Sequence, residues 1–233
     1  MTRLRFQQGL DELKQKLLAM GGLAEQAVDR AVEAYRRRDA SLCQLVLQGE
    51  PPINMAEREI DELALDLLAM QQPMAVDLRF IVAVLKINAD LERVGDQAVN
   101  IAERVRDLLE LPRVELPADI PSMASMTRNM VRQALEAFIG ADADLAEMVL
   151  RMDDHVDRLN RETFRSVNEL AQKSPEAARQ AIDVLLISRN LERVADHATN
   201  IAEDVIFWVR GADVRHHFGP HVPSKAGPGG ESS

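Results

Sequence analysis

Two short acidic runs, one hundred residues apart, contain the side chains of this sequence that could do chemistry. Residues 90–103 read Asp-Leu-Glu-Arg-Val-Gly-Asp-Gln-Ala-Val-Asn-Ile-Ala-Glu, and residues 190–203 read Asn-Leu-Glu-Arg-Val-Ala-Asp-His-Ala-Thr-Asn-Ile-Ala-Glu. Ten of the fourteen positions are identical, which indicates an internal duplication. Carboxylates four residues apart are neighbours on a helix and repel each other, so a bound cation would explain why both copies keep such a pair. The pairs are Glu92/Asp96 and Glu192/Asp196.

In the second half, another acidic pair is expected to face the signature. Helices joined by a short turn run antiparallel, so residues equally far from the turn lie side by side. Reflection through the turn at Pro175 places Asp153 opposite Asp196. It places Asp157 opposite Glu192. Four carboxylates at one level would form a hard-cation site made only of oxygen ligands.

In the first half, the same reflection gives a mixed pair. Glu92 and Asp96 reflect through the turn near Pro73 to about Asn54 and Glu50. An offset of 103 residues between the two second helices gives the same assignment, because it pairs positions 50 and 54 with 153 and 157. An Asn carbonyl can bind a metal ion but brings no charge, so we expect this site to be the weaker one.

Other interpretations of these polar residues stay open. Glu57 and Asp61, also four apart, are rival ligands for the first site. An acidic pair on a helix is more often a solvated face, although duplication and acidic partners favour a metal site here. His155 and His197 occur in one copy each and are treated as incidental. Four further polar residues could extend either site but are expected to hydrogen-bond across the bundle or face water: Asn100, Glu103, Asn200 and Glu203.

An apolar stripe beside the acidic pairs indicates the helices that position them. Leu91, Val94, Ala98 and Ile101 recur at spacings of three and four, the pattern of a helix with one buried face. The same periodicity predicts six helices, three in each half. We expect an all-α fold of two tandem three-helix bundles, placed end to end. The expected helices cover about 3–38, 40–71, 75–109, 123–140, 143–173 and 175–210.

Prolines, caps and composition shifts divide the chain. Asp39 is the expected N-cap of the second helix, and Pro51 and Pro52 should interrupt and kink that helix. Four segments are predicted: an N-terminal bundle over 1–112, a proline-rich linker over 113–121, a C-terminal bundle over 122–215 and a disordered tail over 216–233.

Composition limits the function classes. Hydrophobic residues make up 46% of the chain and aromatic residues only 3%, which is typical of helix bundles. The formal net charge of −10 disfavours nucleic acid and anionic lipid as partners. Cys43 is the single cysteine, which excludes a disulfide framework and a thiolate metal site. Neither an apolar run of eighteen residues nor an N-terminal leader is found, so we expect a soluble, cytoplasmic protein.

These motifs resemble the PhoU family of phosphate-transport accessory and regulatory proteins over about residues 3–217. The resemblance rests on Gln72-Pro73 followed by Asp77-Leu78-Arg79, on the doubled Leu-Glu-Arg-Val-x-Asp signature at 91–96 and 191–196, and on the closing run Gly211-Ala212-Asp213-Val214-Arg215-His216. It implies two three-helix bundles. It also implies a negative regulator that keeps a phosphate-sensing histidine kinase from activating its response regulator and that restrains a phosphate ABC transporter.

The resemblance further implies multinuclear metal clusters, often assigned as iron, with zinc or manganese as alternatives. The implied ligands are Glu50, Asn54, Glu92, Asp96, Asp153, Asp157, Glu192 and Asp196. Glu50/Asn54 departs from the family pattern at its last position. The implied partners are the ATPase of the transporter and the sensor kinase, with a homodimer also expected, and the membrane is reached only through these partners.

Two other function classes compete with a regulator that acts by protein contact. A carboxylate-bridged metalloenzyme of the di-iron type needs Glu-x-x-His on two helices, and the sequence contains no Glu-x-x-His. A metal-storage bundle would leave phosphate-starvation control unchanged when its gene is deleted. The sequence shows no nucleophile–base pair and no glycine-rich phosphate loop, so we expect no enzyme activity.

Overall fold

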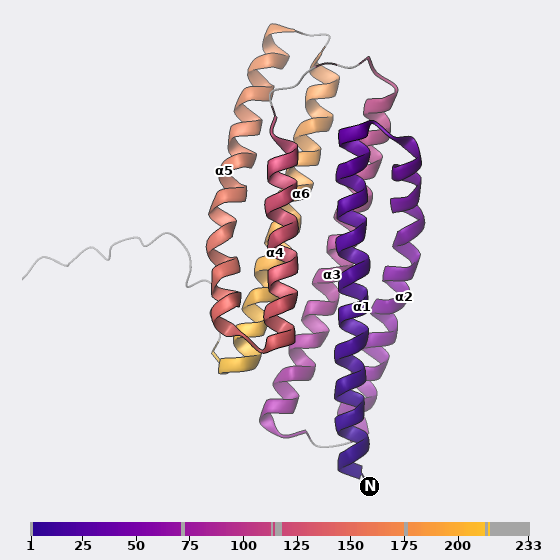
Figure 1. The fold of residues 1–233 in the computed structure, drawn as a ribbon, viewed down its shortest axis with the longest axis vertical. Coiled ribbons are helices and arrows are strands. Elements are labelled where there is room, and N and C mark those ends of the chain that lie inside the picture. Colours follow the sequence, from indigo (N-terminus) through magenta and orange to yellow (C-terminus); the bar gives the residue numbers. More distant parts are fainter. Residues whose placement is uncertain are drawn as a thin grey trace, which may run out of the picture.

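Six long helices account for most of the chain (Figure 1). The computed structural model describes residues 2–70, 73–112, 114, 118–174, 177–212 and 214. The helices are α1 (Thr2–Arg37), α2 (Ala40–Met70), α3 (Ala75–Leu109), α4 (Ile120–Gly140), α5 (Ala143–Lys173) and α6 (Ala178–Arg210). The described residues contain no strand, so the predicted all-α fold with three helices in each half is confirmed. The predicted disordered tail over 216–233 lies outside the described residues, as does part of the predicted linker.

Matching aspartates begin the second helix of each half. The Asp39 Oδ1 atom accepts hydrogen bonds from the backbone amides of Ser41 at 2.8 Å and Leu42 at 3.4 Å. The Asp142 Oδ1 atom accepts from the backbone amides of Asp144 and Leu145, both at 3.0 Å. Such oxygens satisfy amide groups that the first helical turn leaves without a partner. The sequence prediction of Asp39 as an N-cap is therefore confirmed.

Two prolines lie in the second helix without interrupting it, in agreement with the expected range of 40–71, and the kink expected there stays a prediction. Pro51 and Pro52 both lie inside the continuous helix α2. A proline in a helix interior lacks the N–H that would bond to the carbonyl four residues earlier. Both prolines are exposed, so water can reach the carbonyl groups that are left without a donor. Burial of the opposite face, at Val46, Ile53 and Ile60, then keeps the helix continuous.

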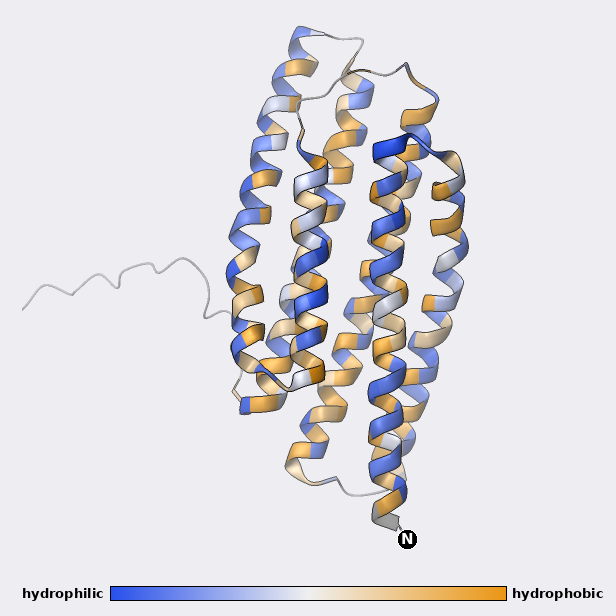
Figure 2. Ribbon diagram, viewed as in Figure 1, coloured by the Kyte–Doolittle hydropathy of each residue, from blue (hydrophilic) through white to orange (hydrophobic). Residues whose placement is uncertain are grey.

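The apolar stripes form the core of each bundle. Leu91, Val94 and Ile101 on α3 are fully buried, as are their counterparts Leu191 and Val194 on α6. Figure 2 shows hydrophobic residues where helices face one another and hydrophilic residues over much of the outer surface. The stripe predicted from spacing alone is therefore the packed face of the central helices.

The two bundles lie side by side, so the expectation that they are placed end to end is wrong (Figure 1). Helix α3 packs along α6, and α1 packs against α4. Lys86 pairs with Asp204, whereas Arg104, further along α3, lies 3.7 Å from Asp183, so α3 and α6 run antiparallel. An end-to-end arrangement would leave the outer apolar surface of both central helices in water, and burial of that surface favours the lateral arrangement.

An aromatic cluster fills one end of the junction between the bundles. The ring centroids of Phe80 on α3 and Trp208 on α6 are 5.1 Å apart, and Phe138 on α4 lies 5.8 Å from Phe80 and 5.3 Å from Trp208. Aromatic rings at these separations add to the stability gained from their burial. The sequence has few aromatic residues, and these three are not spread through the bundles but hold α3, α4 and α6 together.

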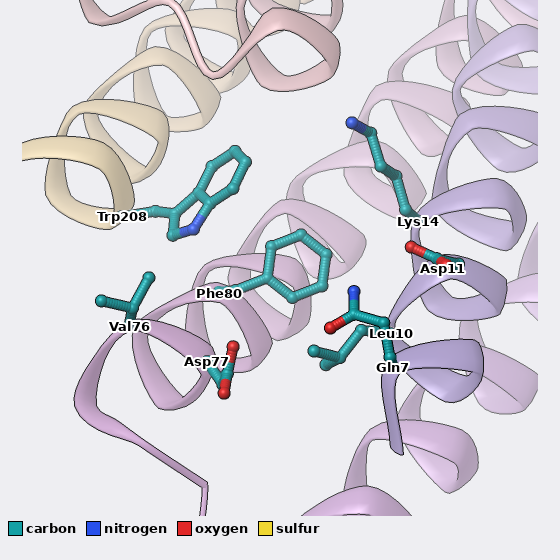
Figure 3. A pocket seen from close by; sticks show the side chains of 8 residues that line it. All are labelled: Gln7, Leu10, Asp11, Lys14, Val76, Asp77, Phe80 and Trp208. Atoms are coloured by element: carbon teal, nitrogen blue, oxygen red, sulfur yellow. The ribbon is translucent and has the colours of Figure 1, made fainter. Parts of the chain in front are cut away.

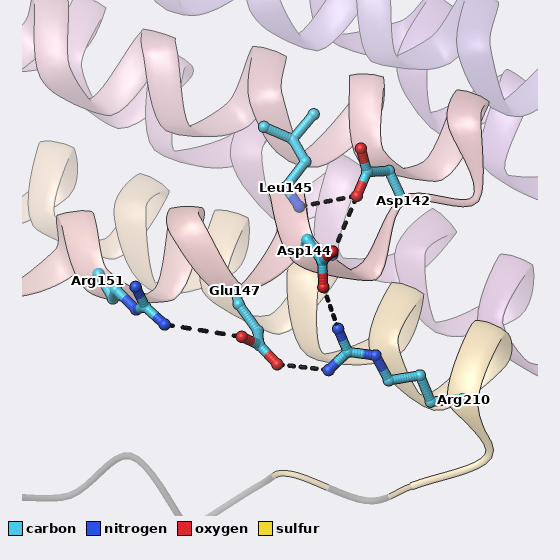
Figure 4. Close-up of polar contacts among 6 residues, drawn as sticks. All are labelled: Asp142, Asp144, Leu145, Glu147, Arg151 and Arg210. Carbon is cyan, nitrogen blue, oxygen red and sulfur yellow. Dashed lines mark hydrogen bonds and ion pairs between the residues drawn. The ribbon is translucent and has the colours of Figure 1, made fainter.

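Ion pairs close the same end of the C-terminal bundle (Figure 4). Arg210, in the last turn of α6, pairs with both Asp144 and Glu147 in the first turns of α5. Arg151 lies one turn further along α5, 3.7 Å from Glu147. A cation at the C-terminal end of one helix and carboxylates at the N-terminal end of its neighbour complement both helix dipoles.

Candidate functional site

The C-terminal acidic face consists of Asp153 and Asp157 on α5 together with Glu192 and Asp196 on α6. Ser188 on α6 donates a hydrogen bond of 2.7 Å to the side-chain oxygen of Asn160 on α5, which fixes the register of the two helices. Counting one turn along each antiparallel helix from this contact brings Glu192 level with position 156. A second turn brings Asp196 level with position 152, so each lies within one residue of its predicted partner.

The carboxylates of this face are close enough to perturb one another. Burial raises the pKa of Asp153 to about 6, and the negative charges of Asp196 and Asp157 add to the effect. Desolvation also raises the pKa of Glu192 and of Asp196, with Asp157 contributing to both. Desolvation and like charges both favour the protonated form of a carboxylic acid. The α5 and α6 carboxylates therefore share one negative surface.

Asp157 and Asp153 differ in what they contact. The Asp157 Oδ2 atom accepts a hydrogen bond of 3.0 Å from Arg161 one turn along α5. The Asp153 Oδ1 atom is buried and has no hydrogen-bond partner in the described part of the chain. A buried polar atom without a partner costs about 1–3 kcal/mol, and a cation bound at that oxygen would remove this cost.

The N-terminal acidic face has a different composition. Asn88 on α3 donates hydrogen bonds to the Glu57 carbonyl at 3.0 Å and to Asp61 Oδ1 at 2.9 Å on α2. This contact brings Glu92 level with about position 55 and Asp96 with about position 51. Both positions are one to two residues later in α2 than those obtained by reflection through the turn.

Glu57 is the α2 carboxylate whose charge acts on this face. Desolvation raises the pKa of Glu92, followed by the charges of Asp96 and Glu57. Desolvation also raises the pKa of Glu57, followed by the charges of Asp61 and Asp96. Of the α2 candidates, the rival residue Glu57 therefore joins Glu92 and Asp96 in one negative surface.

Glu50 and Asn54, the assigned α2 residues, lie on the same side of that helix as Glu57. Both are partly buried, and the Asn54 Oδ1 atom is another buried oxygen without a hydrogen-bond partner among the described residues. The two α2 candidates with side-chain oxygens nearest the level of Glu92 are therefore Asn54 and Glu57. The assignment of Glu50 and Asn54 as ligands stays a prediction, with Glu57 beside them.

The described residues contain no group of three or more His, Cys, Asp or Glu side chains arranged to hold a metal ion. The chemistry of the donor set nevertheless fits a hard cation, because both faces offer oxygen atoms and an excess of negative charge. Each set contains one buried oxygen without a hydrogen-bond partner among the described residues, Asn54 Oδ1 in the first and Asp153 Oδ1 in the second. The two faces therefore have the composition of cation sites, with side chains that would have to turn toward a bound ion.

Sequence reasoning missed a polar contact between the bundles. His197 Nδ1 lies 2.8 Å from Asp90 Oδ1, and Asn200 donates a hydrogen bond of 3.1 Å to the same oxygen. His197 is therefore not incidental. The signal in the sequence is a difference between the copies, because Asp90 is matched by Asn190 and Gln97 by His197.

A pocket of about 220 Å³ lies beside the aromatic cluster (Figure 3). Phe80 and Trp208 form part of its wall, and Asp11, Lys14 and Asp77 bring charges of both signs to it. None of the residues of the two acidic faces lines this pocket. It contains neither a glycine-rich loop nor paired catalytic groups, so its chemistry differs from that of a phosphate site.

Among the described helices, none combines the length and the apolar character that crossing a membrane requires.

Comparisons with known proteins converge on one family. The model of the PhoU domain matches the chain twice, over residues 17–105 and 120–205. The phosphate-specific transport system accessory protein PhoU homolog of Pseudomonas putida is 42% identical, covering 91% of this chain and 83% of the relative. The homolog from Clostridium acetobutylicum is 32% identical over 92% of this chain and 98% of the relative.

Solved structures agree with the sequence comparisons. The crystal structure of PhoU from Pseudomonas aeruginosa has a TM-score of 0.85 and 40% identity, covering 89% of this chain and all of that one. The phosphate transport system regulatory protein PhoU from Streptococcus pneumoniae has a TM-score of 0.83 and 28% identity, covering 90% of this chain and 99% of that one. The two matched segments include the acidic signatures of both bundles.

Proposed function

The chain belongs to the PhoU family, and from this premise we propose that it is an accessory protein that restrains phosphate uptake and the phosphate-starvation response. It acts by contact with the ATPase of a phosphate ABC transporter and with a phosphate-sensing histidine kinase. The observation that carries the proposal is the match of both halves of the chain to the PhoU domain. Relatives named as accessory proteins of a phosphate-specific transport system support it.

The proposed role is regulatory and not catalytic. On the described helices, carboxylates occur without the histidine three residues later that di-iron bundles place beside them. The alternative of a carboxylate-bridged metalloenzyme predicts metal-dependent phosphatase or oxidase turnover that disappears in Glu192→Ala. The alternative of metal storage predicts normal phosphate-starvation control in a deletion strain.

The proposed acidic sites hold hard cations, with iron as the first candidate and zinc or manganese as alternatives. Asp153, Asp157, Glu192 and Asp196 would hold the C-terminal ion or cluster. Glu92, Asp96, Asn54, Glu50 and the rival Glu57 supply the donors of the N-terminal one. A bound cation would neutralise the repelling carboxylates. The chain itself contributes the register of α5 against α6 and a buried Asp153 oxygen for which no described residue is a hydrogen-bond partner.

The proposed location is the cytoplasm, where the transporter ATPase and the kinase domain are reached, so contact with the membrane is indirect. A homodimer is part of the same proposal, and nucleic acid is not a partner because the chain carries a formal net charge of −10.

A deletion strain with a phosphate-starvation reporter tests the regulatory role. In high phosphate, we expect the reporter to be active in the deletion strain and silent again when the full chain is supplied. A reporter that stays silent in the deletion strain contradicts the proposal and favours metal storage.

Metal analysis of the purified, untagged protein tests the sites. We expect bound metal in the wild type and a clear loss in Asp153→Ala/Asp196→Ala. The matched control is Glu162→Ala/Glu169→Ala, which removes the same charge from the exposed side of α5. An equal metal content in all three proteins contradicts the ligand assignment.

A further inference from the structure

A groove that is not part of the proposed metal sites lies on the outside of the C-terminal bundle, between α5 and α6. It has a volume of about 420 Å³. Its apolar surface includes Phe164, which is 59% exposed, and Leu186, which is 39% exposed. The chain has few aromatic residues, and this ring is exposed on a helix surface. Its burial against a partner would be favourable. Three arginines, Arg161, Arg165 and Arg189, line the same groove.

The arginines differ in whether their charge is already compensated. Arg161 forms an ion pair of 3.0 Å with Asp157. Arg165 and Arg189 are exposed, and neither forms an ion pair with a described residue. Arg165 and Arg189 therefore place two guanidinium groups without a close ion pair beside an exposed phenylalanine, although the charge of Arg189 also acts on Glu192 one turn along α6, in a chain whose net charge is −10. The local charge is opposite in sign to that of the whole molecule.

The first bundle lacks this combination at the equivalent place. The contacts of Asn88 and Ser188 relate α2 to α5 by 103 residues and α3 to α6 by 100. Through these offsets, Phe164 corresponds to Asp61 and Arg165 to Glu62. Arg189 corresponds to Ala89. One copy of the duplicated bundle thus presents carboxylates where the other presents a ring and two guanidinium groups, although their cores follow one pattern.

We propose that this groove docks an acidic, amphipathic segment of a protein partner. An apolar side chain of the segment packs on Phe164 and Leu186, while its carboxylates pair with Arg165 and Arg189. Guanidinium groups bind carboxylates through two parallel hydrogen bonds, which adds orientation to attraction. The inference rests on the proposed function, because it assigns a surface for one of the protein contacts through which the chain would act.

A protein segment suits the groove better than a nucleotide does. Arg165 lies inside α5 (Ala143–Lys173) and Arg189 inside α6 (Ala178–Arg210), so backbone N–H groups, which cradle phosphates at helix N-termini, are bonded within the helices there. The groove runs between two packed helices, and such a surface accepts the side-chain ridge of an amphipathic helix. Apolar contact with flanking charge is the recognition mode that these residues provide.

Fluorescence anisotropy with a designed probe tests the docking chemistry on the full chain. The probe is a fluorescein-labelled, 14-residue peptide with two leucines one helical turn apart and glutamates at the flanking positions. We expect Arg165→Glu/Arg189→Glu to weaken binding at least tenfold and Phe164→Ala to weaken it severalfold. The control Arg5→Glu/Arg132→Glu makes the same charge change at exposed positions outside the groove and should bind as the wild type does. All substituted residues are exposed, and melting curves verify folding.

Three outcomes would overturn the proposal. The first is equal affinity of the peptide for the wild type and Arg165→Glu/Arg189→Glu. The second is equal affinity of the wild type for the peptide and for a version with every Glu replaced by Gln. The third is that ATP or phosphatidylglycerol vesicles, and not the peptide, bind in a manner lost in the double variant, which would make the groove a nucleotide or lipid site.

The deletion strain separates failure of this inference from failure of the proposed function. If the wild type restores reporter control, Arg165→Glu/Arg189→Glu should not. Full restoration by the double variant rejects the docking site and leaves the regulatory role intact. Normal control in the deletion strain itself rejects the regulatory role, and peptide binding then still decides what the groove recognises.

Discussion

The two acidic faces share one half and differ in the other. Their α3 and α6 halves keep the same Glu and Asp, at Glu92/Asp96 and Glu192/Asp196. Their α2 and α5 halves have diverged: α5 presents two aspartates four residues apart, whereas α2 presents Glu50 and Asn54 at those positions and an additional carboxylate at Glu57. The C-terminal face therefore has four carboxylates at matching levels of two helices, whereas the α2 carboxylate whose charge acts together with Glu92 and Asp96 is Glu57, at another position of that helix.

The packing of the helices explains where the copies diverged. Helices α3 and α6 contact each other and two further helices of their own bundles, whereas α2 packs only on α1 and α3, and α5 only on α4 and α6. A substitution on a central helix must satisfy neighbours on several sides, but α2 and α5 each have a broad surface in water. The groove combines Phe164 and Arg165 of such an outer helix with Leu186 and Arg189 of the central helix α6. The two copies therefore differ on the outer helices and at positions of the central pair outside the buried stripe, such as Ala89 and Arg189, while the buried stripe itself is shared.

The largest expected effect is on the free energy of unfolding, and its measurement shows whether the two bundles unfold as one unit. Leu91 and Leu191 are equivalent and fully buried. Either Leu→Ala substitution should cost about 3 kcal/mol through lost burial and the cavity left behind. Because α3 and α6 share an interface, we expect one urea transition that shifts equally for both variants. Two separate transitions, each sensitive to one variant, would mean that the bundles are energetically independent.

A reciprocal exchange tests the difference in predicted metal affinity. Asn54→Asp adds the carboxylate that the N-terminal face lacks, and Asp157→Asn removes its counterpart from the C-terminal face. We expect about a tenfold gain in the first variant and about a tenfold loss in the second, because a carboxylate binds a hard cation more strongly than an amide oxygen does. Calorimetric titration of metal-free protein with Mn²⁺ measures both. A loss of affinity in Asn54→Asp, or a gain in Asp157→Asn, would show that Asn54 and Asp157 do not occupy equivalent ligand positions. Glu57→Gln then tests the rival ligand.

The raised pKa of Asp153 predicts a pH dependence in metal-free protein. The pKa is about 6 in the folded chain and near the ordinary aspartate value when unfolded. The folded state therefore binds more protons between these values, and stability falls as pH rises through that window. Because the group is only partly buried, screening reduces the effect to about 1 kcal/mol.

Substitution of Asp153 by Asn should remove this dependence. In a chelator-containing buffer, Asp153→Asn should exceed the wild type in urea midpoint at pH 7.5, with a smaller difference at pH 5. The exposed control Glu162→Gln should follow the wild type at both pH values. A variant less stable than the wild type at pH 7.5 would mean that the Asp153 carboxylate makes a stabilising contact in its ionised form.

The smallest expected effect concerns the position at which the signatures carry Gly95 and Ala195. A Cβ added at Gly95 would lie 2.9 Å from Ile53 Cδ1, and the position equivalent to Ile53 in α5 is the smaller Val156. Gly→Ala in a helix interior gains about 1 kcal/mol, but here the contact offsets it. We expect Gly95→Ala to be neutral or slightly destabilising alone and stabilising by about 1 kcal/mol in an Ile53→Val background. Thermal unfolding of the four proteins gives the coupling, and simple additivity would contradict this explanation.

Several structural features were predictable because they depend on residues close together in the sequence. The spacing of Leu91 and Val94 indicated the buried stripe, and Asp39 indicated the start of α2, since periodicity and capping are local properties of a helix. The pairing of Asp153 with Asp196 was also predictable to within one residue, because the turn between α5 and α6 is short. The first-half register was less accurate, and the interruption expected at Pro51 does not occur, because burial of one helix face outweighs a local preference.

The family, the six helices, the duplication and the acidic pairs on α3 and α6 follow from the sequence alone, because each depends on residue types at fixed spacing. Only the tertiary structure decided that the bundles lie side by side, that Asp90 meets His197, that Glu57 joins Glu92, and that Phe164 and Arg189 line one groove. These contacts join residues on different helices. They depend on how apolar faces of two bundles fit together, and no spacing within a single helix specifies that fit.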